Sequence, residues 1–356
     1  MSYLKYCLQI LKKGPLTMKK RIIYIDLINI FAIFAVLMLH SSQYINKSGM
    51  VMKNNIIQAI FIPAVYLFIM NSGATLLNYR AKYSTKTFLI KRIKRVGIPL
   101  VIWSILYYLY DTKFTAFPGP IPHPNPGIKD FIYSFLNNNI NNIFWFFYAI
   151  ILLYLLTPVL AVLAEKNKDL LFYLVGLNFI GNYVYFYYTH ALNLPIFGGS
   201  VGLQINPIAS EFVGFFIMGY LIKTNYFSAK AQKIMIYFGI LSLFISLLLC
   251  LLKLDNFALG GVLLFSYSIA LYLLIKKGSE ATDFFHRHEK FFAGTASTSL
   301  GIYILHPLFF KLFETLFNPH PTSFLFVWIM PIATYVIGAG LLFIIRKIRF
   351  IKNLIP

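Results

Sequence analysis

Three ionisable side chains interrupt apolar stretches of this 356-residue chain, and they are the first candidates for chemistry. His40 and Glu211 lie near the ends of such stretches, and His306 lies in the middle of one. An ionisable group at the centre of a membrane costs roughly 2.5–3.5 kcal/mol, so its presence favours a function. Imidazole, with a pKa of about 6.5, is suited to proton transfer. The structural alternatives are an interfacial position for His40 and a hydrogen-bonded interior position for Glu211 and His306.

Asn29 and His40 share one face of the first apolar stretch. They are eleven residues apart. At about 100° per residue, a helix returns them to within about 20° of one direction, about 16 Å apart along its axis. Ile33 and Val36 fill the stripe between them. Such a helix would line a passage from one membrane surface to an imidazole near the other.

A basic stretch and an aromatic stretch are the other candidates for ligand contacts. The segment FLIKRIKRVGIP contains Arg92 and Arg95. It either anchors the chain on anionic lipid head groups or forms a positively charged binding site for a phosphorylated ligand. Trp145 is the second residue of the aromatic run FWFFYA. It belongs either to the aromatic belt at a membrane interface or to a surface that stacks on a sugar ring.

The composition identifies the environment in which these residues must be positioned. Hydrophobic residues make up 59% of the chain and charged residues 12%, against about 45–50% and 25% in soluble domains. This excludes a soluble globular protein, a disordered chain, a collagen-like repeat and a disulfide scaffold. The 32 Lys and Arg outnumber the 11 Asp and Glu, but they cluster between apolar runs as topology signals do. No nucleic-acid partner is expected, and no Cys/His spacing predicts a metal site.

Ten apolar segments approach the roughly 20 residues that cross a bilayer as a helix. They are residues 22–44, 56–77, 96–111, 142–164, 169–188, 208–222, 234–252, 256–275, 298–317 and 324–345. With the N-terminus inside, 26 basic residues lie in inner segments and six in outer ones. The positive-inside rule then predicts that both termini are cytoplasmic.

We therefore predict an all-α polytopic membrane protein with about ten transmembrane helices. Its parts are a basic cytoplasmic arm (1–21), a ten-helix membrane domain (22–348) and a cytoplasmic tail (349–356). His40 and Glu211 are then at outer ends of their helices.

Six segments resemble, in order, the signatures of the integral-membrane acyltransferase-3 family. They are IDLINIFAIFAVLMLH (Ile25–His40), IPAVYLFIMNSGATL (Ile62–Leu76), FLIKRIKRVGIP (Phe88–Pro99), FWFFYAIILLYLLTPVL (Phe144–Leu160), FFIMGYLI (Phe215–Ile222) and SLGIYILHPLF (Ser299–Phe309). Within the family, the chain looks most similar to the O-acetyltransferase of enterobacterial common antigen and to the intercellular-adhesin succinyltransferase. It departs from the pattern at Asn29, where the family has Arg, and at Ile143, where a His is often found.

The resemblance implies transfer of an acyl group, usually acetyl, from cytoplasmic acyl-CoA to a hydroxyl of a surface glycan or its lipid-linked precursor. It implies a multi-pass protein of a bacterial plasma membrane whose partners are membrane lipid, acyl-CoA and the glycan. Acyl-CoA is a co-substrate, and no permanently bound cofactor or metal is expected.

The resemblance also assigns roles to the candidate residues. His40 would be the general base, and Glu211 would orient that imidazole or bind the acceptor. The coenzyme would be bound by Asn29, Arg92 and Arg95, and the substrate by Ser72, Trp145 and His306.

Two other functions fit the same residues. Ten helices with sparse polar groups also suit a transporter or flippase for a polysaccharide or lipid-linked sugar, although inverted repeats and broken helices are not evident. The neutral Asn29 is also compatible with a non-catalytic lipid-binding scaffold. Consumption of a thioester separates the acyltransferase from both.

Overall fold

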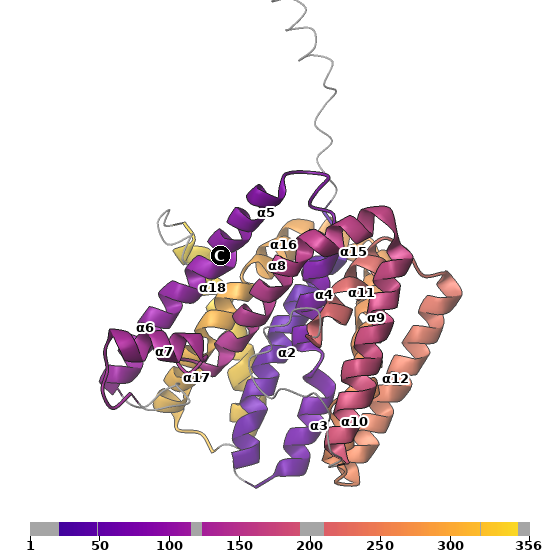
Figure 1. The fold of residues 1–356 in the computed structure, drawn as a ribbon. Helices are drawn as coiled ribbons and strands as arrows, with labels where there is room; N and C mark the ends of the chain where they lie inside the picture. The colour runs from indigo at the N-terminus through magenta and orange to yellow at the C-terminus, as the bar shows by residue number, and fades with distance from the viewer. Residues whose placement is uncertain (1–20, 48, 115–122, 193–209, 321, 348–356) are drawn as a thin grey trace, which may run out of the picture.

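The computed structural model describes residues 21–47, 49–114, 123–192, 210–320 and 322–347. Within these residues every regular element is a helix, and no strand occurs (Figure 1). Eight helical stretches are long and apolar enough to cross a membrane. The prediction of an all-α polytopic membrane protein is therefore confirmed.

Five of these eight stretches are built around one long helix each: α2 (Ile23–Lys47), α8 (Trp145–Lys166), α12 (Ala229–Leu251), α14 (Gly261–Glu280) and α17 (Ser299–Phe317). The other three are composite: α3 (Val51–Phe61) with α4 (Ala64–Leu76), α9 (Lys168–Asn178) with the π-helix η3 (Phe179–Phe186) and α10 (Tyr187–Ala191), and the π-helix η4 (Leu325–Ile329) with α18 (Met330–Ile345). The break between α3 and α4 falls at Pro63, because proline has no N–H to donate to the helical ladder.

Shorter helices complete the described chain. They are α5 (Thr85–Arg92), the π-helix η1 (Ile93–Gly97), α6 (Ile98–Phe114), α7 (Ile128–Leu136), the 3-10 helix η2 (Asn142–Phe144), α11 (Phe212–Lys223), α13 (Asp255–Ala258), α15 (Phe284–Arg287) and α16 (Glu289–Ser297). Two of the ten predicted spans, 96–111 and 208–222, correspond to α6 and α11. With 12 residues, α11 is about 18 Å long, which is shorter than a hydrocarbon core of about 30 Å.

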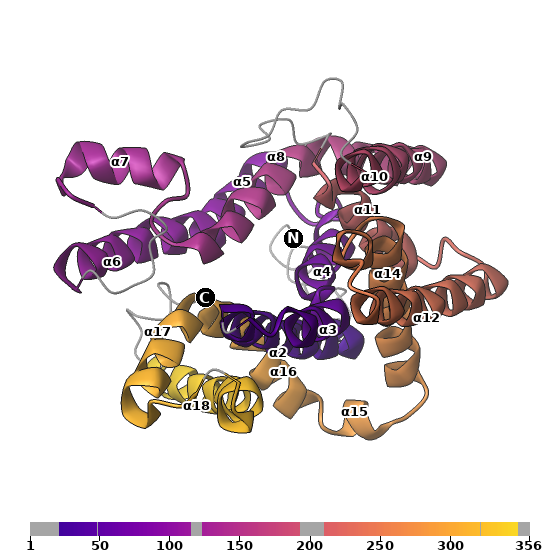
Figure 2. The ribbon, with the colours of Figure 1, turned by 90° about the horizontal axis from the view of Figure 1, so that it is seen from below.

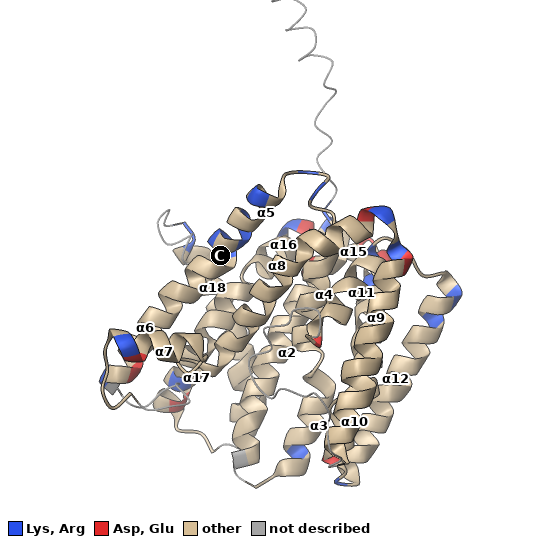
Figure 3. Cartoon of the chain, viewed as in Figure 1, with Lys and Arg blue, Asp and Glu red and all other residues tan. Residues whose placement is uncertain are grey.

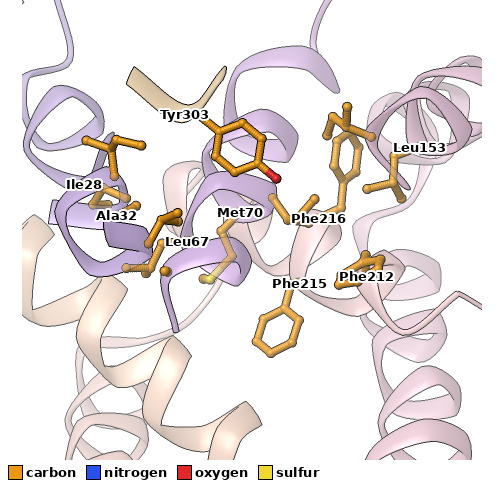
Figure 4. Packing of buried hydrophobic residues seen from close by; sticks show 14 of the residues in the cluster. Ile28, Ala32, Leu67, Met70, Leu153, Phe212, Phe215, Phe216 and Tyr303 are labelled. Carbon is orange, nitrogen blue, oxygen red and sulfur yellow. The ribbon is translucent and has the colours of Figure 1, made fainter. Parts of the chain in front are cut away.

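The helix α2 lies at the centre of the bundle (Figure 2). It packs against α3, α4, α14, α16, α17 and α18. Ile28, Ala32, Ile33 and Leu37 of α2 are fully buried, because spacings of four and five residues place them on one side of a helix. Figure 4 shows Ile28 and Ala32 of this helix beside Leu67 of α4. The candidate residues of α2 are therefore held by neighbours on almost every side.

The closest packing in the bundle joins α4 and α11. A Cβ atom added at Gly73 would lie 1.7 Å from the carbonyl oxygen of Phe216, and one added at Gly219 would lie 1.9 Å from that of Met70. Only glycine permits two backbones to approach so closely, as small residues do at membrane helix interfaces. Met70 and Phe216 lie together in the resulting core (Figure 4). Gly73 thus fixes the position of its neighbour Ser72.

Lys and Arg gather at one end of the molecule, around α5 and the ends of α9 and α12 (Figure 3). The positive-inside rule predicts that this end is cytoplasmic, and we call it the inner end. The start of α2 and the end of α18 both lie there, because α16 contacts α2 and Ser297 of α16 binds Arg346. Two chain ends on one side agree with an even number of crossings.

Candidate active site

A cavity of about 410 Å³ lies at the inner end, between α2, α4, α8 and α17 and beside the basic segment α5–η1. Its volume falls in the range of small-molecule sites, roughly 300–1,000 Å³. Four of the residues singled out from the sequence line it: Asn29, Ser72, Arg92 and Arg95. The fold therefore brings together residues that come from three separate sequence segments.

Asn71 and Asn29 form the polar wall of this cavity. The Asn71 amide nitrogen donates to the Ile25 carbonyl at 2.9 Å and to Asn29 Oδ1 at 3.0 Å. The Ser299 hydroxyl donates to the Asn29 carbonyl at 3.3 Å. Asn71 Oδ1 is buried and accepts no hydrogen bond from the described residues. A buried acceptor left unpaired costs free energy, so this oxygen is available to an N–H donor of a ligand.

Arg92 and Arg95, at the end of α5 and in η1, supply positive charge to the cavity. Both side chains line the cavity, and α5 is anchored by Phe88, which is fully buried and stacks on Tyr79 at 4.3 Å. The Arg92 guanidinium carbon lies 5.7 Å from the Tyr154 ring centroid, and its Nε is buried without a hydrogen-bond partner among the described residues. No carboxylate of the described chain pairs with either arginine within 4 Å.

A third guanidinium lies beside this cavity, at Arg346, the residue that follows α18. Arg346 Nη1 and Nη2 donate to the Ser297 hydroxyl and carbonyl, each at 2.7 Å, and Ser297 lines the cavity. Burial and then the charge of Arg95 lower the pKa of Arg346, so the two cations lie close to each other. Since neither has a carboxylate partner among the described residues, the arrangement favours an anionic ligand.

His40 and His306 contact each other beyond the end of the cavity. Their ring centroids are 4.8 Å apart, and His306 is 1% exposed. Tyr303 connects them to the cavity, because its ring lines that space and lies 5.9 Å from the His306 ring. The Tyr303 hydroxyl donates to the Ile143 carbonyl.

Glu211 and Trp145 form a separate group. Glu211 immediately precedes α11, and its carbonyl accepts a hydrogen bond from the Tyr183 hydroxyl at 2.8 Å. Trp145 stacks on Phe212 at 5.7 Å with an interplanar angle of 30°. In the described chain Glu211 forms no ion pair with His40. Because α11 is short, Glu211 lies only about 18 Å along the helix from the inner end.

The fold and the cavity define a multi-pass membrane protein with an arginine-lined site at its inner end. A family model described as an acyltransferase domain matches residues 22–345, nearly the whole chain. The chain therefore belongs to the acyltransferase-3 family, and it is a membrane acyltransferase that transfers groups other than amino-acyl groups. The resemblance of the six segments is confirmed at the level of the family. Comparisons with curated proteins and with solved structures give no match.

Sequence reasoning missed two of the residues that build this site. Asn71 stands beside Ser72 as an amide inside an apolar run, and that polarity was a signal that could have singled it out. Arg346 gave no such signal, since it lies in a basic cluster that the positive-inside rule explains fully. Only the packing of α18 against α16 and α17 brings it to Ser297, a residue that lines the cavity.

Proposed function

We propose that the protein transfers an acyl group, acetyl being the first candidate, from cytoplasmic acyl-CoA to a hydroxyl of a cell-surface polysaccharide or its lipid-linked precursor. The observation that carries this proposal is the inner cavity, which is lined by Arg92, Arg95 and Asn71, a residue with an unpaired buried amide oxygen, and which has Arg346 beside it, bonded to the lining residue Ser297. The setting that fits is a bacterial plasma membrane, with lipid, coenzyme and glycan as partners.

The cavity suits the chemical groups of coenzyme A. Guanidinium groups bind phosphates bidentately, and Arg92, Arg95 and Arg346 offer such groups at the cytoplasmic end, where the coenzyme is made. The pantetheine arm of the coenzyme carries amide N–H groups, which match the free Asn71 Oδ1. Asn29 supports this wall through its bond to Asn71, although it cannot supply the charge of the family's arginine.

His40 is the general base in this proposal. It removes the proton of the acceptor hydroxyl while that oxygen attacks the thioester carbonyl carbon. The new C–O bond forms, the C–S bond breaks, and the coenzyme leaves as a thiolate that takes the proton back from His40. Tyr303 marks the route by which the thioester approaches the histidines from the cavity.

The acceptor would be bound on the other side of this route. Trp145, which is 39% exposed, offers a ring face to a sugar, and Glu211 offers a carboxylate to its hydroxyls. Ser72 lines the donor cavity and would contact the acyl-CoA arm. His306 contacts His40, so it would act at the reacting centre and not on the distal part of the glycan.

Transfer of a radiolabelled acyl group in membrane vesicles tests the proposal. The resemblance to the O-acetyltransferase of enterobacterial common antigen and the intercellular-adhesin succinyltransferase makes acetyl-CoA and succinyl-CoA the first donors to compare. We expect label from one of them to appear in envelope glycan. Glycan movement without thioester consumption would instead establish a transporter.

A further inference from the structure

Pro307 lies in the interior of α17, directly after His306. In an α-helix the N–H of residue 307 donates to the carbonyl of residue 303. Proline has no N–H, so the Tyr303 carbonyl lacks its helical donor. His306 Nδ1 lies 2.7 Å from this carbonyl oxygen and takes the vacant place.

This contact determines which nitrogen of His306 carries hydrogen. A carbonyl oxygen only accepts, so Nδ1 must be the donor, and in a neutral imidazole Nε2 then holds the lone pair. His306 is 1% exposed, and its ring is enclosed by Tyr303 at 5.9 Å and Phe310 at 5.6 Å. The enclosed ring has little access to solvent that would exchange the two tautomers.

The neighbouring ring is that of His40, at 4.8 Å between centroids. In the described chain neither histidine has a carboxylate within ion-pair distance. His40 therefore lacks the carboxylate that orients the base in many hydrolases. The imidazole of His306 lies beside it instead. A protonated His40 has N–H donors on both nitrogens, and a lone pair on His306 Nε2 would accept one of them.

We propose that Pro307, by freeing the Tyr303 carbonyl, fixes His306 as the Nδ1–H tautomer and makes His306 the positioning residue for His40. The tautomer itself is independent of the proposed function, whereas the positioning role rests on His40 acting as the base. His306 with hydrogen on Nε2 would present a donor to His40 and could not stabilise its protonated form.

Nitrogen NMR of the histidine-labelled full chain in detergent tests the tautomer. The His306 signal is assigned by its loss in His306→Gln. We expect the Nδ1–H pattern in the wild type and a mixture of tautomers in Pro307→Ala, where a new N–H shares the Tyr303 carbonyl. Pro158→Ala is the matched control, because Pro158 also lies inside a long helix four residues after a tyrosine, Tyr154; it should leave the His306 signal unchanged. An unchanged Nδ1–H pattern in Pro307→Ala overturns the proposal.

Steady-state kinetics test the positioning role. The Gln amide reaches the position of Nε2 and the Asn amide that of Nδ1, so His306→Gln should retain more kcat than His306→Asn. We expect kcat to fall roughly 10-fold for Gln and 100-fold for Asn, with the KM for acetyl-CoA unchanged. Equal kcat values in these two variants, or full kcat in Pro307→Ala with an altered tautomer, would refute the positioning role. A wild type that consumes no thioester would refute the proposed function and with it the positioning role, whereas the tautomer is tested separately by the NMR experiment.

Discussion

The inner cavity and the histidine pair differ in how completely their polar groups are satisfied. In the cavity, Arg92 Nε and Asn71 Oδ1 are buried without hydrogen-bond partners among the described residues. In the histidine pair, His306 Nδ1 bonds to a carbonyl of its own helix. Buried polar atoms without hydrogen-bond partners are expected at a ligand-binding site. A hydrogen bond within the protein instead holds a side chain in one orientation. The difference supports our proposal that binding, near Asn29, and chemistry, near His40, are separated along α2.

Loss of the His40 imidazole should have the largest effect. We expect His40→Ala to lower kcat by roughly 10²–10⁴-fold, the usual contribution of general acid–base catalysis, with little change in the KM for acetyl-CoA. His190→Ala, at an exposed histidine of α10, is the matched control and should behave as wild type. Kinetics on purified protein in detergent measure both. A wild-type kcat in His40→Ala would reject His40 as the general base.

Removal of the Arg92 guanidinium should affect binding and leave chemistry intact. Hydrogen bonds to charged groups contribute about 3 kcal/mol at most, which corresponds to roughly 100-fold in affinity. We therefore expect Arg92→Gln to raise the KM for acetyl-CoA by up to about 100-fold at nearly constant kcat. Lys94→Gln removes a charge from the same basic segment at an exposed residue that does not line the cavity. Equal effects of the two changes would show that the segment acts only as a diffuse positive surface.

The Arg346 guanidinium should contribute less than that of Arg92. Of its five N–H donors, two already point at Ser297, which leaves three for a ligand. We expect Arg346→Gln to raise the KM for acetyl-CoA by about 10-fold, equivalent to about 1.4 kcal/mol. Lys347→Gln, at the adjacent exposed lysine, should have no effect. If dephospho-CoA and CoA bind the Arg346→Gln variant equally while the wild type distinguishes them, the 3′-phosphate is the group that Arg346 contacts.

Much of this architecture can be predicted from hydropathy and charge, because both can be evaluated over a short segment of the sequence. The apolar stretches predict where the long helices lie, and Pro63 falls at the break between α3 and α4, as expected for a residue without an N–H donor. Hydropathy predicts a short sixth span, at residues 208–222, but it places the start of α11 too early. The apolar run extends back to residue 208, but the helix begins only at Phe212, and hydropathy does not register where a helix starts within an apolar run.

The site was less predictable than the fold, for a physical reason. The spacing of Asn29 and His40 is a property of one helix and can be worked out from the sequence. The contact between His40 and His306, and the bond between Arg346 and Ser297, depend on which helices are neighbours. Periodicity within a segment carries no information about that choice. The loss of the hydrogen bond between residue 307 and the Tyr303 carbonyl is an exception. It follows from the four-residue spacing within one helix, so it can be predicted from the sequence.

The glycine contacts of α4 and α11 also restrict how the molecule can move. With backbone against backbone at Gly73 and Gly219, rotation of either helix would drive a side chain into its partner's main chain. We therefore expect these two helices to move together as one rigid unit in the interior of the bundle. Any movement that admits the proposed coenzyme is then expected at α5 and α8, which pack through side-chain contacts such as Phe88 against Tyr154.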